Sequence, residues 1–598
     1  MVQQPEAGKA SAAAREVDTA LTLAYGALAL LVAVRLLVTP WPTMWPWGLN
    51  TQRFLAVPLA FSLWAVMALP FIGPVGAWWA ETLERLGNRL ASSSSARLTA
   101  ATVFALVVFL LDDRTMFTGD SLIRRVASDS PEFLARFKQS LPLELLLFER
   151  LPLAIQGFLL PAGMLPRLVG MAAAFAIAMA GLRLGREHTR RGVALVAVAC
   201  VVCFGGYLAV CTGLGKPAAL LAALTAITAL LSLRVATSGR VLAPLGWAMF
   251  AALVLHRAGA LLLPCWLLAL GLSLRRGTRE SSVARGTTWV FALLPLAALA
   301  VVGPRLLHIV LGVDLPYHMS GAALIAGGPP SPLAAPWRLL DLVNLSLLLV
   351  PAGLPLLMAA TLRPGAWLKT RETAVLLALL APWLIIAAIA RPVQGVFRDL
   401  DFFAPGAVAF AAQCAWILSR LSASETRFRR LAAAITMTSV ASTLQLLCCF
   451  HDPASGLARV RAYLSEAPRR SAGDYETTWD FLALRSFALR DWPLAADACA
   501  HAARLAPSPR LLMMLGIART YTGDYAGARQ AYARVIERSP NELVAWAGLA
   551  GLAARINDSA LADSALAHVR KFPRTSAKAR ELRRVIEQYP EFWPCAPR

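Results

Sequence analysis

The sequence is poor in acidic residues and in charge of either sign. Asp and Glu together number 35 among 598 residues, charged residues make up 16% of the chain, and hydrophobic residues make up 58%. Soluble proteins carry about 25% charged residues. With a mean hydropathy of +0.58, this composition excludes an ordinary soluble protein and indicates an integral membrane protein.

Familiar catalytic motifs are missing as well. The chain contains no Walker phosphate loop, no His-Glu-x-x-His and no Gly-x-Ser-x-Gly. Its nine cysteines are scattered. Cys200 and Cys203 have the spacing of a redox or metal motif, but they lie in an apolar run without a nearby His or acid, so we interpret them as small core residues.

Basic residues exceed acidic residues by 23, a surplus that in a soluble protein would suggest nucleic-acid binding. Most of the Lys and Arg residues lie in short loops between apolar runs, where the positive-inside rule and anionic lipid account for them. We therefore expect membrane lipid, and not nucleic acid, as the partner of these residues.

Apolar runs recur along the first three quarters of the chain, and runs of roughly 17–25 residues are long enough to cross a membrane as helices. The pattern predicts an all-α, polytopic bundle of about thirteen spans. The predicted spans are 19–38, 54–72, 98–111, 166–182, 192–210, 217–233, 241–255, 258–274, 288–303, 340–361, 373–390, 402–419 and 431–449.

The basic loops set the expected orientation. They fall on one side of the membrane over the whole chain if the N-terminus is cytoplasmic, which places the C-terminal domain outside, in a bacterial-type inner or plasma membrane. The polar residues 1–18 are predicted to be a disordered cytoplasmic N-terminus. The apolar stretch 141–161 carries Glu144 and Glu149, and a crossing there would move every later basic loop outside, so we expect it to be interfacial or re-entrant.

Composition divides the chain into a membrane domain (19–450) with an outer first loop (112–165), a linker (451–475) and an amphipathic C-terminal domain (476–598). Three segments of the C-terminal domain align at a period of 33–34 residues, with Trp479 matching Leu512 and Trp546. This period with a large residue, a small residue and a closing Pro is the tetratricopeptide pattern of stacked helical hairpins. Such an array binds a protein or peptide partner, or rigidifies the membrane domain.

The first outer loop carries three candidate catalytic carboxylates, Asp112, Asp113 and Asp120. A carboxylate held at a membrane surface commonly works on a substrate. For Asp112 and Asp113 the alternative is that they end the third span at the water interface. Asp120 lies several residues beyond that span, after Thr118-Gly119, and a carboxylate there can act as the base for an acceptor hydroxyl.

Further polar residues collect on the same predicted face. Arginine binds phosphate through its planar fork, so basic residues there are candidates for binding a donor phosphate, with buried or interfacial roles as the alternative. These candidates are Arg391, Arg398, His256 and Arg257. Other candidates are His318, Asp399 and Asp401. Asp399 and Asp401 form an Asp-x-Asp motif, a spacing that is common by chance. The sequence therefore predicts no certain metal or cofactor, and binding of a divalent metal remains an open alternative.

The membrane domain resembles the GT-C superfamily of integral-membrane glycosyltransferases. The resemblance is carried by Thr118-Gly119-Asp120-Ser121, the amphipathic segment Phe133–Phe137, Leu141-Pro142-Leu143 and the segment RDLDFFAP at 398–405. A membrane domain of this kind followed by tetratricopeptide repeats also resembles the transmembrane O-mannosyltransferases of the secretory pathway. The paired acids typical of protein mannosyltransferases are not clearly present.

The resemblance implies a transferase that takes a sugar from a polyprenyl-phosphate donor and passes it to an extracytoplasmic acceptor. Asp120 would be its catalytic acid or base, and Arg391 and Arg398 would bind the donor phosphate. Two alternatives remain open: an O-antigen ligase or polymerase type of enzyme, and a non-enzymatic membrane scaffold whose repeats recruit an envelope-assembly partner. A transporter is disfavoured, because few charges lie at mid-membrane.

Overall fold

The computed structural model describes residues 4–122, 140–155, 158–161, 163–238, 241–276, 282–318, 338–362, 367–390, 392, 394–421, 425–470, 472–573 and 575–588. These residues form helices joined by turns and, within those ranges, no strand, which confirms the all-α class. The chain divides into two compact units, Met1–Arg459 and Val460–Arg598.

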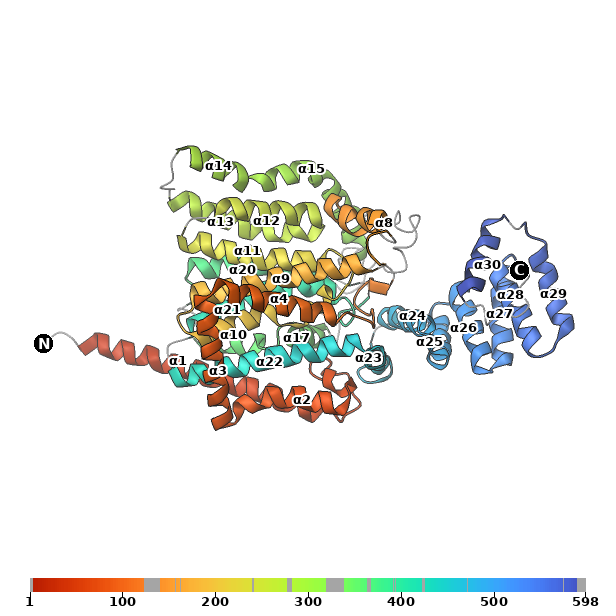
Figure 1. Cartoon of the computed structure of the whole chain (residues 1–598), viewed down its shortest axis with the longest axis horizontal. Helices are drawn as coiled ribbons and strands as arrows, with labels where there is room; N and C mark the ends of the chain where they lie inside the picture. Colours follow the sequence, from red (N-terminus) through yellow and green to blue (C-terminus); the bar gives the residue numbers. More distant parts are fainter. Residues whose placement is uncertain are drawn as a thin grey trace. The chain divides into compact units, whose positions relative to one another are not determined.

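The first unit is a bundle of apolar helices (Figure 1). Its early elements are α1 (Gln4–Val38), η1 (Thr51–Phe54), α2 (Val57–Ala68), η2 (Leu69–Phe71), α3 (Gly73–Ser92), α4 (Ser94–Leu110), α7 (Pro142–Leu145), η3 (Leu146–Arg150), α8 (Leu151–Ile155), α9 (Met164–His188), α10 (Gly192–Cys203), η4 (Gly206–Cys211) and α11 (Ala218–Ser238). Its later elements are α12 (Leu242–Leu255), η5 (Arg257–Leu262), α13 (Leu263–Arg276), α14 (Ser282–Ala292), α15 (Leu294–Ile309), η6 (Val310–His318), α17 (Arg338–Leu349), α18 (Gly353–Thr361), α20 (Arg371–Ile389), α21 (Leu400–Arg420), α22 (Glu425–His451) and α23 (Pro453–Ser465).

Eight helices in the described ranges are long and apolar enough to cross a membrane, or up to ten if each of two bent helix pairs counts as one span. The two bent pairs are Val57–Phe71 with Gly73–Ser92, at 94°, and Arg338–Leu349 with Gly353–Thr361, at 106°. Three predicted spans coincide with the shorter apolar helices α4, α10 and α12. The membrane-helix character is therefore confirmed, whereas the count of thirteen is not.

The centre of this bundle is built from α9, α10, α11, α21 and α22, which pack against one another. All twelve residues of α10 are buried, and most are Ala, Val, Cys or Gly. Small side chains allow helix backbones to approach closely where lipid provides no hydrophobic drive for association. By contrast, α14 and α15 lie at the edge of the bundle (Figure 1) and pack on α12.

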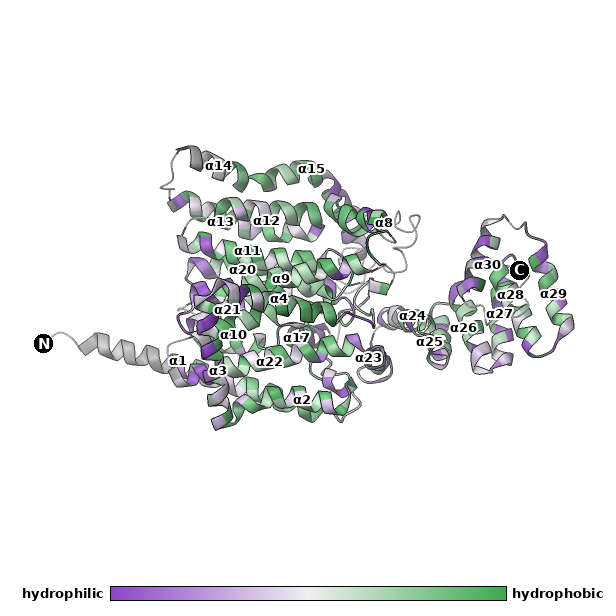
Figure 2. Ribbon diagram, viewed as in Figure 1, coloured by the Kyte–Doolittle hydropathy of each residue, from purple (hydrophilic) through white to green (hydrophobic). Residues whose placement is uncertain are grey.

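One end of the bundle is strongly hydrophilic, around the labels α3 and α21 in Figure 2. Glu84 in α3 accepts hydrogen bonds from the backbone N–H groups of Gly192 and Val193, which brings the loop after α9 to this end. Arg234 at the end of α11 forms an ion pair with Glu187 at the end of α9. Basic residues from several predicted cytoplasmic loops thus share one end of the bundle.

Two expected segments differ from the structure. The N-terminus is helical from Gln4 as part of α1, since its alanine-rich sequence favours helix and continues directly into the first span. The predicted linker holds helix α23 and the start of α24. In α23, Pro453 opens the helix, and the buried side chains of Leu457 and Val460 recur at helical spacing.

Within the stretch 141–161, the described residues form the short consecutive elements α7, η3 and α8, and these contain no candidate membrane span. The predicted surface helix at Phe133–Phe137 lies outside the described residues.

The second unit contains three consecutive helical hairpins and one further helix. These are α24 (Ala472–Ala488) with α25 (Trp492–Leu505), α26 (Pro509–Thr522) with α27 (Tyr525–Arg538), α28 (Leu543–Arg555) with α29 (Ser559–Arg570), and α30 (Ala577–Gln588).

The hairpins repeat the same local chemistry. The second helix of each begins at an aspartate N-cap, Asp491, Asp524 or Asp558, whose carboxylate accepts a backbone N–H three residues on. A tryptophan stacks on a histidine in the first and third hairpins, with ring centroids 4.2 Å apart for Trp479–His501 and 3.9 Å apart for Trp546–His568. The sequence period thus appears as a repeated helix pair.

Candidate active site

Residues 111–121, which include the start of the predicted first outer loop, are held by three segments that are distant in sequence. The backbone N–H groups of Arg114 and Thr115 both donate to the carbonyl of Phe450, at the end of α22, over 3.1 and 2.9 Å. The N–H of Asp113 donates to the carbonyl of Thr212 over 3.0 Å. The N–H of Gly119 donates to the carbonyl of Arg398 over 3.0 Å. These bonds fix the loop that carries Asp120.

Arg398 stabilises the same loop with its side chain. Its guanidinium is buried and donates to the carbonyls of Phe117 and Gly119, each over 3.2 Å. It does not line either of the two pockets described below. The structure therefore places this predicted phosphate ligand behind the loop, as a group that orients the turn before Asp120.

Gly119 has φ +52° and lies directly against Asp401. A Cβ atom at this position would be 2.4 Å from Asp401 Oδ1, and the left-handed backbone conformation also disfavours any side chain. The Thr118-Gly119-Asp120 sequence is thus explained by a close approach between the first loop and the start of α21.

Lys216 joins the acids of these two segments. Its Nζ lies 2.9 Å from Asp120 Oδ2 and 2.8 Å from Asp401 Oδ2, and the Lys216 side chain is only 15% exposed. On the other side, Gln394 donates a hydrogen bond from Nε2 to Asp120 Oδ1, and its backbone N–H donates to Asp399 Oδ2 over 2.9 Å. The carboxylate of Asp120 is therefore oriented at both oxygens.

The charges within this cluster depend on each other. Burial acts to lower the pKa of Lys216, but the negative charges of Asp401 and Asp120 outweigh it, so that this pKa lies above its ordinary value and Lys216 is a cation. Burial, with the neighbouring charge of Asp401, raises the pKa of Asp399 to about 7. The cluster thus holds one exchangeable proton near neutral pH.

The cluster lies at one side of a cavity of about 730 Å³. Its walls include aliphatic and aromatic side chains from α11, α15, η6 and α20, among them Leu221, Leu306, Val310 and Trp383. Its polar lining groups are Asp120, Glu144, Lys216, His256, Arg257, Asp314, Gln394, Asp399 and Asp401. An apolar space with a few convergent polar groups has the character of a ligand site.

The cavity brings together five of the predicted site residues: Asp120, His256, Arg257, Asp399 and Asp401. His256 caps η5, its Nδ1 accepting the N–H of Ala258 over 3.2 Å. Arg257 Nε lies 2.9 Å from Asp314 Oδ2. Of the others, Arg391 lies outside the described residues, and His318 is the last residue of η6, its side chain not among those described.

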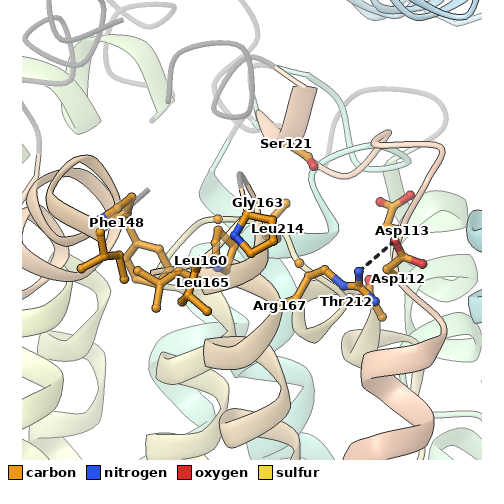
Figure 3. A pocket seen from close by; sticks show the side chains of 16 residues that line it. Asp112, Asp113, Ser121, Phe148, Leu160, Gly163, Leu165, Arg167, Thr212 and Leu214 are labelled. Carbon is orange, nitrogen blue, oxygen red and sulfur yellow. Dashed lines mark ion pairs between the residues drawn. The ribbon is translucent and has the colours of Figure 1, made fainter. Parts of the chain in front are cut away.

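Asp112 and Asp113 lie apart from this cavity and line a second, smaller pocket (Figure 3). Asp112 lies among basic side chains: its carboxylate is 3.3 Å from Arg114, 3.1 Å from the ring of His451 and 3.8 Å from Arg167. Asp113 Oδ1 accepts the N–H of Met116 over 2.7 Å, which stabilises the turn of the loop. Both carboxylates thus have structural partners.

Sequence reasoning did not identify Lys216, Gln394 or Arg167. One signal for Lys216 was present, since it stands on the face that the positive-inside rule leaves poor in basic residues. A solitary basic residue there needs an acidic partner or a ligand. Among the described residues, no three His, Cys, Asp or Glu side chains form a group that could hold a metal ion.

The pKa of Asp399 predicts a pH dependence of stability. An unfolded aspartate titrates near pH 3.9, so between that pH and about 7 the folded protein holds one more proton at this residue. Through this group the free energy of unfolding is largest below about pH 4 and falls as the pH rises to about 7. We expect Asp399→Asn to remove this fall, measured as the difference in thermal midpoint between pH 5 and pH 8.

The control for this measurement is Asp563→Asn, which removes an exposed carboxylate of α29 in the second unit. Its difference in midpoint should match that of the wild type. If Asp399→Asn also matched the wild type, Asp399 would not hold the exchangeable proton.

Comparison of the chain with protein families, curated proteins and solved structures yields no match.

Proposed function

We propose that this protein is an integral-membrane glycosyltransferase that moves a sugar from a polyprenyl-phosphate donor to a hydroxyl group of an extracytoplasmic acceptor. The observation that carries the proposal is the placement of Asp120. Its carboxylate lines a cavity of about 730 Å³ with apolar walls, and its two oxygens are oriented by Lys216 and Gln394. An amphipathic substrate requires both the apolar space and the oriented charge.

In the proposed reaction, Asp120 accepts the proton of the acceptor hydroxyl. The hydroxyl oxygen bonds to the anomeric carbon as the bond from that carbon to the phosphate oxygen breaks, and polyprenyl phosphate leaves with the electron pair. The anomeric configuration is inverted. Lys216 favours the ionised form of Asp120 by charge, and the ion pair of Arg257 with Asp314 at the cavity wall provides a cation for the leaving phosphate.

The proposal also includes the number of membrane spans, their orientation and the role of the C-terminal repeats. A GT-C-like domain of thirteen spans follows if α4, α10 and α12 are counted with the longer helices and the bent pairs. The basic end of the bundle would face the cytoplasm together with the N-terminus. The three helical hairpins would form a tetratricopeptide solenoid on the extracytoplasmic side, in an inner or plasma membrane, and bind the acceptor or a partner protein.

The test is native mass spectrometry of the protein extracted in a mild neutral detergent. We expect a co-purified polyprenyl phosphate, bare or glycosylated, and at least a tenfold lower occupancy in Arg257→Gln. Arg234→Gln is the matched control, because Arg234 also pairs with a carboxylate but at the basic end, and its occupancy should equal that of the wild type. Bulk phospholipid alone, in the same amount in all three proteins, would contradict the proposal.

A further inference from the structure

The small pocket beside the first loop has one charged end and one apolar end (Figure 3). It measures about 60 Å³ and lies between the first loop, the segment η3–α8, the first turn of α9 and the loop before α11. Arg167, Asp112 and Thr212 mark its charged end, and Phe148, Leu160 and Leu165 its apolar end. A pocket of this size holds a headgroup of a few heavy atoms and the start of a chain.

The loop before α11 presents unused hydrogen-bond donors at the charged end. Gly213 and Gly215 line the pocket with φ +103° and +70°, left-handed conformations that glycine adopts without strain. In the described part of the chain, the backbone N–H groups of Gly213, Leu214 and Gly215 meet no acceptor. Successive free N–H groups in such a loop form a concave site for an anion.

Arg167 adds a full positive charge to these donors. Its Nη2 donates to the carbonyl of Phe109 over 2.9 Å, which positions the guanidinium, whereas its buried Nε has no acceptor in the described structure. Its contact with Asp112 is loose, at 3.8 Å. Because the Arg167 side chain is 28% exposed, the part of the guanidinium beyond the buried Nε is available to a ligand.

The two acids at this pocket do not offset the donors. Asp112 already pairs with Arg114 at 3.3 Å and contacts the ring of His451 at 3.1 Å, and both lie closer to it than Arg167 does. Asp113 is committed through Oδ1 to the N–H of Met116. The local balance of donors and acceptors thus favours an anion next to Arg167.

We propose that this pocket binds an amphiphile with an anionic headgroup, the anion lying between Arg167 and the amides of Gly213 and Gly215, and the first carbons of the chain packing on Phe148 and Leu165. The apolar end distinguishes this ligand from a free inorganic anion, because burying methylene groups there favours binding of a chain. The inference does not rest on the proposed transferase activity, which uses the other cavity.

The experiment measures saturable binding of radiolabelled dodecyl phosphate to the full-length protein in dodecyl maltoside, a neutral detergent. We expect Arg167→Gln to weaken binding at least tenfold and Arg167→Lys to retain most of it. Phe148→Ala should weaken binding about fivefold by reducing the apolar contact. Inorganic phosphate should compete at least tenfold less well than unlabelled dodecyl phosphate does.

Arg234→Gln is the matched control, because Arg234 also pairs with a carboxylate but lies at the basic end of the bundle and does not line the pocket. It should bind the probe as the wild type does. Equal binding by Arg167→Gln and the wild type would overturn the site. If inorganic phosphate competed as well as unlabelled dodecyl phosphate, the pocket would bind a free anion and not an amphiphile. The thermal midpoint of each variant without probe, together with the Arg167→Lys result, separates lost binding from lost folding.

Discussion

Replacing Asp120 by Asn should lower sugar transfer by at least a hundredfold while leaving the protein folded. An amide cannot accept the proton of the acceptor hydroxyl, and general-base catalysis contributes typically 10²–10⁴-fold. The substitution keeps the size of the side chain, and Lys216 keeps its second carboxylate partner, Asp401. Membranes containing the protein are incubated with a total lipid-linked sugar extract, and the release of free polyprenyl phosphate is followed by mass spectrometry, which requires no knowledge of the sugar.

Glu187→Gln serves as the control, since it also converts a partly exposed acid to its amide but at the basic end of the bundle. It should release polyprenyl phosphate at the wild-type rate. If Asp120→Asn also released polyprenyl phosphate at the wild-type rate, Asp120 would not be the base. That result would favour the alternative of a non-enzymatic membrane scaffold. A variant protein that accumulates bound, still glycosylated lipid would be the strongest support for the proposed step.

The second large effect is expected on stability, at Lys216. Lys216→Gln removes the cation that Asp401 and Asp120 share, and the Asp401 side chain is only 10% exposed. Removing one partner of a buried ion pair destabilises a protein by about 3–5 kcal/mol. We expect a loss at the lower end of this range, because the Asp120 side chain is 32% exposed and keeps contact with water. Unfolding in denaturant, followed by tryptophan fluorescence, measures it.

A double variant distinguishes charge from packing. Adding Asp401→Asn to Lys216→Gln also removes the buried charge of Asp401 and should recover more than half of the lost stability. Arg234→Gln breaks a partly exposed pair with Glu187 and should change stability by less than about 1 kcal/mol. If Lys216→Gln behaved like Arg234→Gln, the cluster would not hold the first loop against α21.

The fold was predictable where a long local pattern determines it. Apolar runs predicted the membrane helices, and the period of 33–34 residues anticipated helical hairpins, whose second helices begin after the N-caps Asp491, Asp524 and Asp558. The sharp bends were not predictable, because hydropathy measures composition and not direction. One bend follows Pro70 and the other surrounds Pro351, and proline is a common cause of such breaks.

The candidate site was predictable in part. The acids of the first loop and of the segment before α21 were expected on one face, and the cavity contains Asp120, Asp399 and Asp401 together. Arg398 was expected to bind phosphate, yet its guanidinium hydrogen-bonds to backbone carbonyls. Residue type indicates that an arginine binds oxygen, but only the packing decides whether that oxygen belongs to a ligand or to the chain itself.

The bonds between the first loop and Phe450 also bear on the biogenesis of the protein. Thr115 and Phe450 are 335 residues apart, so the carbonyl that anchors the first loop is synthesised long after the loop itself. During translation the early helices can enter the membrane one after another, but the geometry around Asp120 is complete only when the end of α22 has arrived. A prematurely terminated chain would lack the anchored loop, so an unfinished protein would carry no ordered candidate site around Asp120.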